Sequence, residues 1–96
     1  METTPHLYYS REPSALGERM GGELAILHVN SGTYFGLNEI GAEIWDLLEQ
    51  PRTLAQIVQH LQEIYEVDED RCRADTQTLL TQLEAGQLIQ SVPRGD

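Results

Sequence analysis

The chain has 96 residues, about the size of one compact domain, and 40% of them are hydrophobic, which excludes full disorder. Sixteen Asp and Glu residues against six Lys and Arg give a net charge of −10. Affinity for nucleic acids and for anionic membranes comes largely from Lys and Arg, so neither is an expected partner. A neutral or cationic peptide is compatible with this charge.

The sequence also predicts a cytoplasmic location. The N-terminus lacks the basic-then-apolar pattern of a signal peptide, and no apolar run approaches the length of a bilayer span. The single cysteine, Cys72, cannot form an intramolecular disulfide, which fits a reducing compartment.

The first part of the chain is predicted to form a small antiparallel sheet. Gly21-Gly22 and Asn30-Ser31-Gly32 supply the turn chemistry of hairpins. The run before the second turn is apolar on both faces, as a central strand would be, and the run after it is rich in aromatic and β-branched residues. The β-prone runs cover residues 7–9, 15–20, 24–29 and 33–37.

Two helices are predicted next. Asn38 is placed to cap a helix over residues 39–49, which Pro51 ends. Thr53, with Gln56 three residues later, forms a capping box for the second helix. Apolar side chains recur at helical spacing on both helices and predict their buried faces: Ile40, Ile44, Trp45, Leu47 and Leu48, then Leu54, Ile57, Val58, Leu61 and Ile64.

A third helix is predicted over residues 71–85, with Gly86 as its C-cap and Leu88-Ile89 as a short apolar tail that packs back. The fold class is therefore α+β: a three-stranded antiparallel sheet followed by three helices, in the order of a winged helix-turn-helix. We expect one domain over residues 1–96, with a core of about 15–92 and frayed ends.

Neither a catalytic nor a metal site is expected. His6, His28 and His60 have no Cys, His or carboxylate at ligand spacing, so no metal or other cofactor is predicted. Arg71, Arg73 and a helix start all favour the thiolate of Cys72. No neighbouring motif supplies a base or an oxyanion hole, however, and the chain has no phosphate-binding loop. We therefore predict a binding protein and not an enzyme.

The third helix argues against DNA binding. In a DNA-binding helix-turn-helix, a late helix presents basic or amide side chains to the major groove. Here Arg71 and Arg73 are accompanied by Asp75 and Glu84 and preceded by the acidic residues 68–70. The sign of the charge is wrong for a phosphate backbone.

Three segments carry a resemblance to a known family. An aromatic strand runs into Leu-Asn, a Gly-Ala step and Ile-Trp over residues 32–45; Tyr-Glu-Val-Asp follows at 65–68, and Gly-Gln-Leu-Ile at 86–89. In this order and spacing they resemble the PqqD-like family, and most of all the stand-alone RiPP recognition elements of lasso-peptide biosynthesis. Thr76, where an aliphatic residue is usual, and Gln87 depart mildly from the pattern.

The resemblance implies a function. A precursor's leader peptide would add as a further strand along the third strand's open edge, in the groove beside the third helix. The protein would present that leader to a leader peptidase and, in lasso systems, to the ring-closing cyclase. Two alternatives stay open: a winged-helix DNA-binding regulator, and a PqqD-type peptide chaperone for a radical SAM enzyme.

The residues themselves support an open strand edge. Residues 33–37 contain no Pro and no Lys, the usual devices that block an edge, and Gly36 leaves room for close approach. Asp75 is placed to pair with a basic leader residue. A structural role remains the alternative for Tyr34, Phe35 and Leu79. The predicted peptide-binding residues are Thr33, Tyr34, Phe35, Gly36, Leu37, Cys72, Asp75, Thr76 and Leu79.

Overall fold

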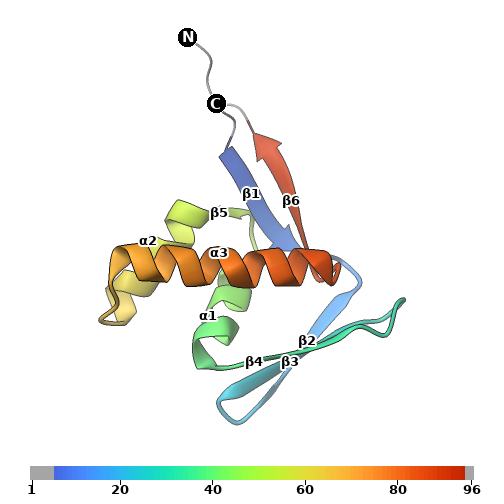
Figure 1. The fold of residues 1–96 in the computed structure, drawn as a ribbon. Helices are drawn as coiled ribbons and strands as arrows, with labels where there is room; N and C mark the ends of the chain where they lie inside the picture. Colours follow the sequence, from blue (N-terminus) through green and yellow to red (C-terminus); the bar gives the residue numbers. More distant parts are fainter. Residues whose placement is uncertain (1–5, 95–96) are drawn as a thin grey trace.

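A computed structural model describes residues 6–94 and arranges them as two antiparallel sheets at opposite ends of a layer of helices (Figure 1). Each sheet has three strands, in the orders β2-β3-β4 and β5-β1-β6. The α+β prediction, with a three-stranded antiparallel sheet followed by three helices, is confirmed, but a second sheet accompanies it. The elements are β1 His6–Arg11, β2 Ala15–Met20, β3 Glu23–His28, β4 Tyr34–Leu37, α1 Glu39–Leu47, β5 Arg52–Thr53, α2 Leu54–Ile64, α3 Glu69–Ala85 and β6 Ile89–Arg94.

The β2-β3-β4 sheet has one buried face and one open face. On β3, Leu24 and Ile26 are buried, and they lie opposite Leu37 and Phe35 of β4. Leu27, the next residue after Ile26, points to the opposite, open face of the sheet and is 44% exposed. The prediction that this run is the central strand is confirmed. Its second apolar face is exposed and not buried, because helices pack on one face only.

Side-chain caps fix where the helices begin. The Asn38 side chain accepts a hydrogen bond from the Gly41 N–H, so α1 begins directly after β4. Thr53 and Gln56 form the predicted capping box at the start of α2. The Asp68 side chain accepts from the Arg71 N–H and starts α3 two residues before the predicted position.

Trp45 of α1 anchors the helices to the sheet. It is 3% exposed, and Gly17 of β2 faces its indole so closely that a Cβ on Gly17 would lie 2.8 Å from Nε1. Arg11 lies over the indole ring, with its guanidinium 4.7 Å from the ring centroid. Its Nε and Nη2 both donate hydrogen bonds to the Trp45 carbonyl. The absence of a side chain at Gly17 therefore decides how closely β2 and α1 pack.

The second sheet joins the two ends of the described chain. β1 pairs with β6 along its whole length, from His6 opposite Arg94 to Arg11 opposite Ile89, and β5 adds two residues on the other side. Leu88 and Ile89 pack back on the core as predicted, at 0% and 2% exposed, but Ile89 also begins a six-residue strand. That strand was not predicted, because its partner lies about 80 residues away, beyond the reach of local patterns.

Some boundaries and buried positions also differ from the prediction. α1 ends at Leu47, two residues early, and Ile40 and Ile64 are 40% and 49% exposed although helical spacing placed them in the core. Tyr9 of β1, upstream of the expected core, is 4% exposed. The predicted fraying concerns the extreme ends, and residues 1–5 and 95–96 lie outside the described part of the chain. None of the helices within residues 6–94 has the length and apolar character that crossing a bilayer requires.

Candidate peptide-binding site

β4 is an edge strand, and its backbone alternates between two directions. Within residues 6–94 it pairs with β3 only. The His28 N–H donates a hydrogen bond to the Thr33 carbonyl at 2.8 Å. Because backbone groups alternate in direction along an antiparallel strand, His28, Ile26 and Leu24 all point their N–H and C=O groups at β4. Ile26 and Leu24 therefore bond to Phe35 and Leu37. The N–H and C=O groups of Tyr34 and Gly36 point outward along the open edge.

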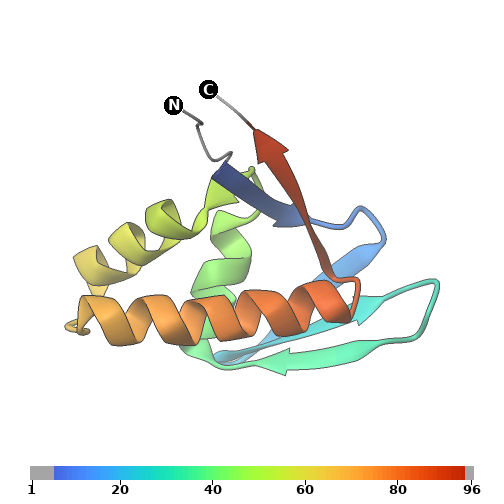
Figure 2. The same ribbon diagram turned by 45° about the horizontal axis from the view of Figure 1, so that its top comes forward.

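A groove of about 740 Å³ runs beside this edge. Figure 2 shows α3 running along β4, and the groove lies between these elements and the start of α1. The side chains of α3 that reach it sit at spacings of three and four residues, so they share one helix face. The lining residues are Met20, Glu23, Leu24, Ala25, Tyr34, Phe35, Gly36, Leu37, Asn38, Ile40, Gly41, Ile44, Asp75, Thr76, Leu79 and Gln82.

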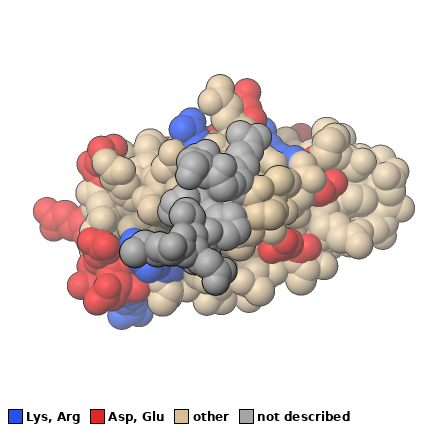
Figure 3. Space-filling model, turned by 90° about the horizontal axis from the view of Figure 1, so that it is seen from above, with Lys and Arg blue, Asp and Glu red and all other residues tan. Residues whose placement is uncertain are grey.

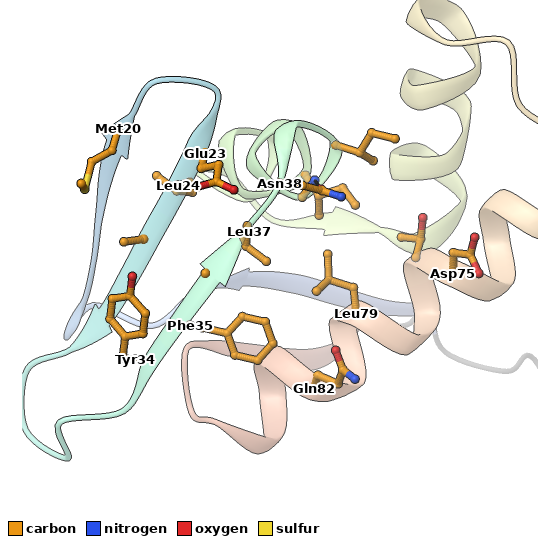
Figure 4. Close-up of a pocket in the computed structure, with 16 residues that line it drawn as sticks. Met20, Glu23, Leu24, Tyr34, Phe35, Leu37, Asn38, Asp75, Leu79 and Gln82 are labelled. Atoms are coloured by element: carbon orange, nitrogen blue, oxygen red, sulfur yellow. Dashed lines mark hydrogen bonds between the residues drawn. The ribbon is translucent and has the colours of Figure 1, made fainter.

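The groove has an apolar floor formed by residues from both walls. Phe35 points from β4 toward α3, near Leu79 and Gln82 (Figure 4). Phe35 and Leu79 are half-buried, so each packs on the core and also presents surface to the groove. Leu37 and Thr76 are 5% and 3% exposed and form the base of the groove. An apolar side chain entering here would exchange water for contacts with Phe35 and Leu79.

The charge of the groove is negative. Glu23 and Asp75 are its acidic lining residues, and neither Arg nor Lys is among the described residues that line it. Asp75 has one cationic neighbour, Arg71, at 3.8 Å, and both side chains are largely exposed. Asp75 can therefore turn to a cation of a ligand with little energetic cost.

A smaller pocket of about 290 Å³ continues the groove past Ile40, Asp75 and Thr76, toward the turn between α2 and α3. Cys72 and Tyr65 line it. Burial raises the pKa of Tyr65 and the nearby carboxylates Glu39 and Glu43 add to the effect, so its phenol stays protonated and able to donate a hydrogen bond.

Seven of the nine predicted site residues line the main groove: Tyr34, Phe35, Gly36, Leu37, Asp75, Thr76 and Leu79. Thr33 lies outside it, in the turn before β4, where its hydroxyl hydrogen-bonds to Ser31 and its methyl group faces Gly86. Cys72 lies in the smaller pocket, with its sulfur 4.0 Å from the Thr76 hydroxyl.

Nine of the sixteen residues that line the groove were not predicted as site residues, and Gln82 and Ile40 are two of them. Gln82 follows Asp75 and Leu79 on the same face of α3, so helical spacing could have identified it. Ile40 was assigned to the core, yet it lines both the groove and the smaller pocket. Its position depends on the angle at which α1 leaves β4, which no sequence pattern specifies.

The described residues contain no group of three or more His, Cys, Asp or Glu side chains that could hold a metal ion. The imidazole of His28 accepts a hydrogen bond from the Ser31 N–H at its Nδ1, and His60 lies 2.9 Å from Glu43. Both contacts join neighbouring elements or turns, so a structural role accounts for these two histidines.

Two solved structures share this fold. A chain described as TbiB1 in complex with the TbiA(beta) leader peptide is 30% identical, with a TM-score of 0.77 over 84% of this chain and 94% of that one. A lasso peptide synthetase B1 complexed with the leader peptide is 24% identical, with a TM-score of 0.75 over 85% and 96% of the two chains, and this likeness concerns the fold alone.

Comparison with curated proteins gave no match. The family model of the coenzyme PQQ synthesis protein D, PqqD, matches residues 23–89, from the start of β3 to the first residue of β6. This segment is more than half of the chain and contains β4, all three helices and most of the groove lining. The chain therefore belongs to the PqqD family.

Proposed function

We propose that this protein binds the leader segment of a ribosomally made lasso-peptide precursor by adding it as a strand to the open edge of β4. The observation that carries the proposal is the pair of outward-facing residues, Tyr34 and Gly36, beside an apolar groove. Two similar structures are described as complexes with leader peptides, and one of them is 30% identical to this chain.

Tight binding of a flexible peptide requires both backbone hydrogen bonds to the β4 edge and apolar contacts in the groove. Backbone hydrogen bonds contribute about 0.5–1.5 kcal/mol each, while ordering a flexible peptide costs about 2–5 kcal/mol. Tyr34 and Gly36 offer two N–H and two C=O groups, so strand pairing alone does little more than offset that cost. Two apolar anchors at about 1.5–3 kcal/mol each bring the affinity into the micromolar range or below. Phe35 and Leu79 are the surfaces against which such anchors would pack.

The β2-β3-β4 sheet has a second open edge, on β2, which is less suited to accept a peptide strand than the edge on β4. β2 lies at the other side of the same sheet and is also unpaired on one side within the described residues. Its inner face, however, is occupied by the Trp45 ring against Gly17, and Arg19 is paired with Asp46. Of the two edges of this sheet within residues 6–94, the β4 edge is the one that combines unpaired backbone with an adjacent apolar groove.

The protein would act without catalysis and would present the bound leader to a leader peptidase and a lasso cyclase in the cytoplasm. The order of a three-stranded sheet and three helices supports a winged helix-turn-helix classification. The second role that the sequence resemblance implied, that of a peptide chaperone for a radical SAM enzyme, stays the alternative, and the matching family model is named for coenzyme PQQ synthesis. The same groove would serve that role, with a different peptide.

Fluorescence anisotropy with a labelled leader peptide tests the proposal. The peptide is the leader of the precursor encoded beside this protein's gene, and a scrambled peptide of the same composition is the control. We expect a dissociation constant of about 1 μM or below for the leader, and binding at least about tenfold weaker for the scrambled peptide. Equal binding of both peptides, or none at all, contradicts the proposal.

A further inference from the structure

A buried hydroxyl lies in the wall between the groove and the smaller pocket. Thr76 of α3 lines both cavities, although only 3% of its surface is exposed. Among residues 6–94, its hydroxyl has one hydrogen-bond partner, the Cys72 thiol, at an Oγ1–Sγ distance of 4.0 Å. Sulfur is a weak donor and a weak acceptor, so most of the hydrogen-bonding capacity of this hydroxyl remains unused. Buried polar groups are nearly always well hydrogen-bonded, and an exception calls for an explanation.

The other threonines of α3 show the usual arrangement for a helix. Thr78 and Thr81 each donate a hydrogen bond to the carbonyl four residues earlier, at 3.0 and 2.9 Å. Both are exposed, so water could satisfy them as well. Thr76 is the buried threonine of this helix, and within the described chain its hydroxyl makes no such bond. A valine would fill the same volume without burying a hydroxyl, so packing alone does not account for Thr76.

The surroundings of Thr76 favour an uncharged ligand group. The smaller pocket also presents the apolar side chains of Leu61 and Val67, so a charge brought to Thr76 would lose its hydration. The charges near this wall, Asp75 and Arg71, are largely exposed and face each other across 3.8 Å. A cationic ligand side chain would therefore stay at the exposed Asp75. A hydroxyl or a carboxamide can enter, because it loses less hydration and gains a hydrogen bond.

A peptide strand on β4 would bring side chains to this wall. Every second side chain of such a strand turns toward α3, as those of Phe35 and Leu37 do. Leu37 points from β4 toward α3 (Figure 4), and with Thr76 it forms the base of the groove. The inward side chain nearest the Leu37 end of β4 is therefore the one that reaches Thr76.

We propose that Thr76 determines which leader is accepted, because its hydroxyl hydrogen-bonds to an uncharged polar side chain of the bound leader at the wall between the groove and the smaller pocket. The inference rests on the proposed function, since the leader must occupy the groove. An aliphatic residue at the same place in a competing peptide would cover the hydroxyl and leave it without a strong partner. Selectivity therefore comes mainly from the rejection of such peptides.

A double-mutant cycle between the protein and its leader tests the proposal. The leader is that of the precursor encoded beside this protein's gene, and each uncharged polar residue in it is replaced in turn by the apolar residue nearest in shape. Serine becomes alanine, threonine valine, tyrosine phenylalanine, asparagine leucine and glutamine methionine. Anisotropy measures the binding of every peptide to wild type, Thr76→Val and Thr78→Val. Thr78→Val is the matched control, because Thr78 is exposed and does not line either cavity.

We expect one replacement in the leader to weaken binding to wild type and to Thr78→Val by about fivefold to tenfold. The same replacement should change binding to Thr76→Val by less than about twofold, because the hydrogen bond is already absent there. Thr76→Ser keeps the hydroxyl and should keep the preference of the wild type. Thermal unfolding of all variants should show that Thr76→Val is at least as stable as wild type, since it removes a buried hydroxyl with a weak partner.

Three results would overturn the inference. The first is a leader in which no replacement distinguishes wild type from Thr76→Val. The second is a tightly bound leader that contains no serine, threonine, tyrosine, asparagine or glutamine. The third is a loss of the preference in Thr76→Ser, because the hydroxyl is still present there.

The specificity inference and the proposed function fail separately. If wild type does not bind the unmodified leader, the proposed function is wrong. If wild type, Thr76→Val and Thr78→Val all bind the leader and respond equally to every replacement, only the role of Thr76 is wrong.

Discussion

In the proposed site, successive residues of β4 would contribute alternately through their backbone and through their side chains. Tyr34 and Gly36 turn their backbone groups to the open edge, while Phe35 and Leu37 turn their side chains to the groove. Strand pairing reads no sequence, so selectivity for one peptide has to come from the groove side chains. Changes at Gly36 and at Leu79 should therefore separate the two contributions.

At Gly36, two substitutions isolate the backbone N–H. Gly36→Pro removes the outward donor and places its ring where the ligand backbone would approach, so we expect leader affinity to fall by at least about tenfold. Gly36→Ala is the matched control, since an added Cβ meets no atom within 4 Å and the N–H remains. Anisotropy measures both, and circular dichroism checks the fold. Normal binding by a folded Gly36→Pro variant would place the site elsewhere.

Leu79 tests the apolar floor. Leu79→Glu puts a charge where a leader side chain would be desolvated, and we expect binding to weaken by about tenfold or more. Thr78→Glu is the control, because Thr78 precedes Leu79 on α3 but is exposed and does not line the groove. Thermal unfolding is measured for both, since Leu79 also packs on the core. Equal leader affinity in both variants would exclude Leu79 from the site.

Asp75 tests the rim charge. Its side chain is 75% exposed, so a contact with a basic leader residue contributes at most about 1 kcal/mol and is screened by salt. Asp75→Lys should weaken leader binding by up to about fivefold, and by less as salt is added. Glu63→Lys makes the same charge change on α2, away from the groove, and should have little effect. An equal loss in both variants would indicate only a general effect of net charge.

At the level of elements, the contact between β2 and α1 holds the sheet against the helices. Asn38 ties the end of β4 to the start of α1, and Trp45 then reaches back to Gly17 on β2. This loop of contacts sets the position of β4, and therefore the width of the groove between β4 and α3. The groove is thus supported in part by Gly17 and Trp45, which do not line it.

Gly17→Ala should show this support. The new Cβ would lie 2.8 Å from Trp45 Nε1, and overpacking of this kind costs about 1–3 kcal/mol. For a domain of this size, each kcal/mol lowers the melting temperature by about 4–8 °C. Gly22→Ala is the control, because an added Cβ there meets nothing within 4 Å. If both variants melt at the wild-type temperature, Trp45 can shift without cost and the contact does not limit the packing.

For the whole molecule, charge distribution is the dominant feature. Figure 3 shows carboxylates gathered at the end where α2 meets α3, which agrees with the exposed Glu66, Asp68, Glu69 and Asp70. The net charge of −10 repels nucleic acid at long range, and the α2-α3 turn that a DNA-binding helix-turn-helix would present is acidic.

A gel shift tests this charge argument. We expect no shifted band with DNA from upstream of the gene, even at low salt, where phosphate contacts are strongest. A basic winged-helix protein on the same gel is the positive control. A shifted band near stoichiometric protein would favour the DNA-binding alternative over peptide binding.

The sequence by itself determined what depends on neighbouring residues. The caps at Asn38 and Thr53, the turn at Gly21-Gly22, the burial of Trp45 and the edge strand after residue 33 all follow from local hydrogen bonding and apolar spacing, which act over a few residues. The motifs at residues 32–45, 65–68 and 86–89 likewise indicated the PqqD family, whose model matches residues 23–89.

Only the tertiary structure decided the remainder. The pairing of β1 with β6, the exposure of Ile40 at the junction of two pockets, and the place of Thr76 between the groove and the smaller pocket depend on which elements meet. Those meetings are fixed by burial and by backbone pairing between segments far apart in the chain. Local sequence patterns do not specify these long-range contacts, because one strand can pair with many others and the packing of the whole core determines which pairing forms.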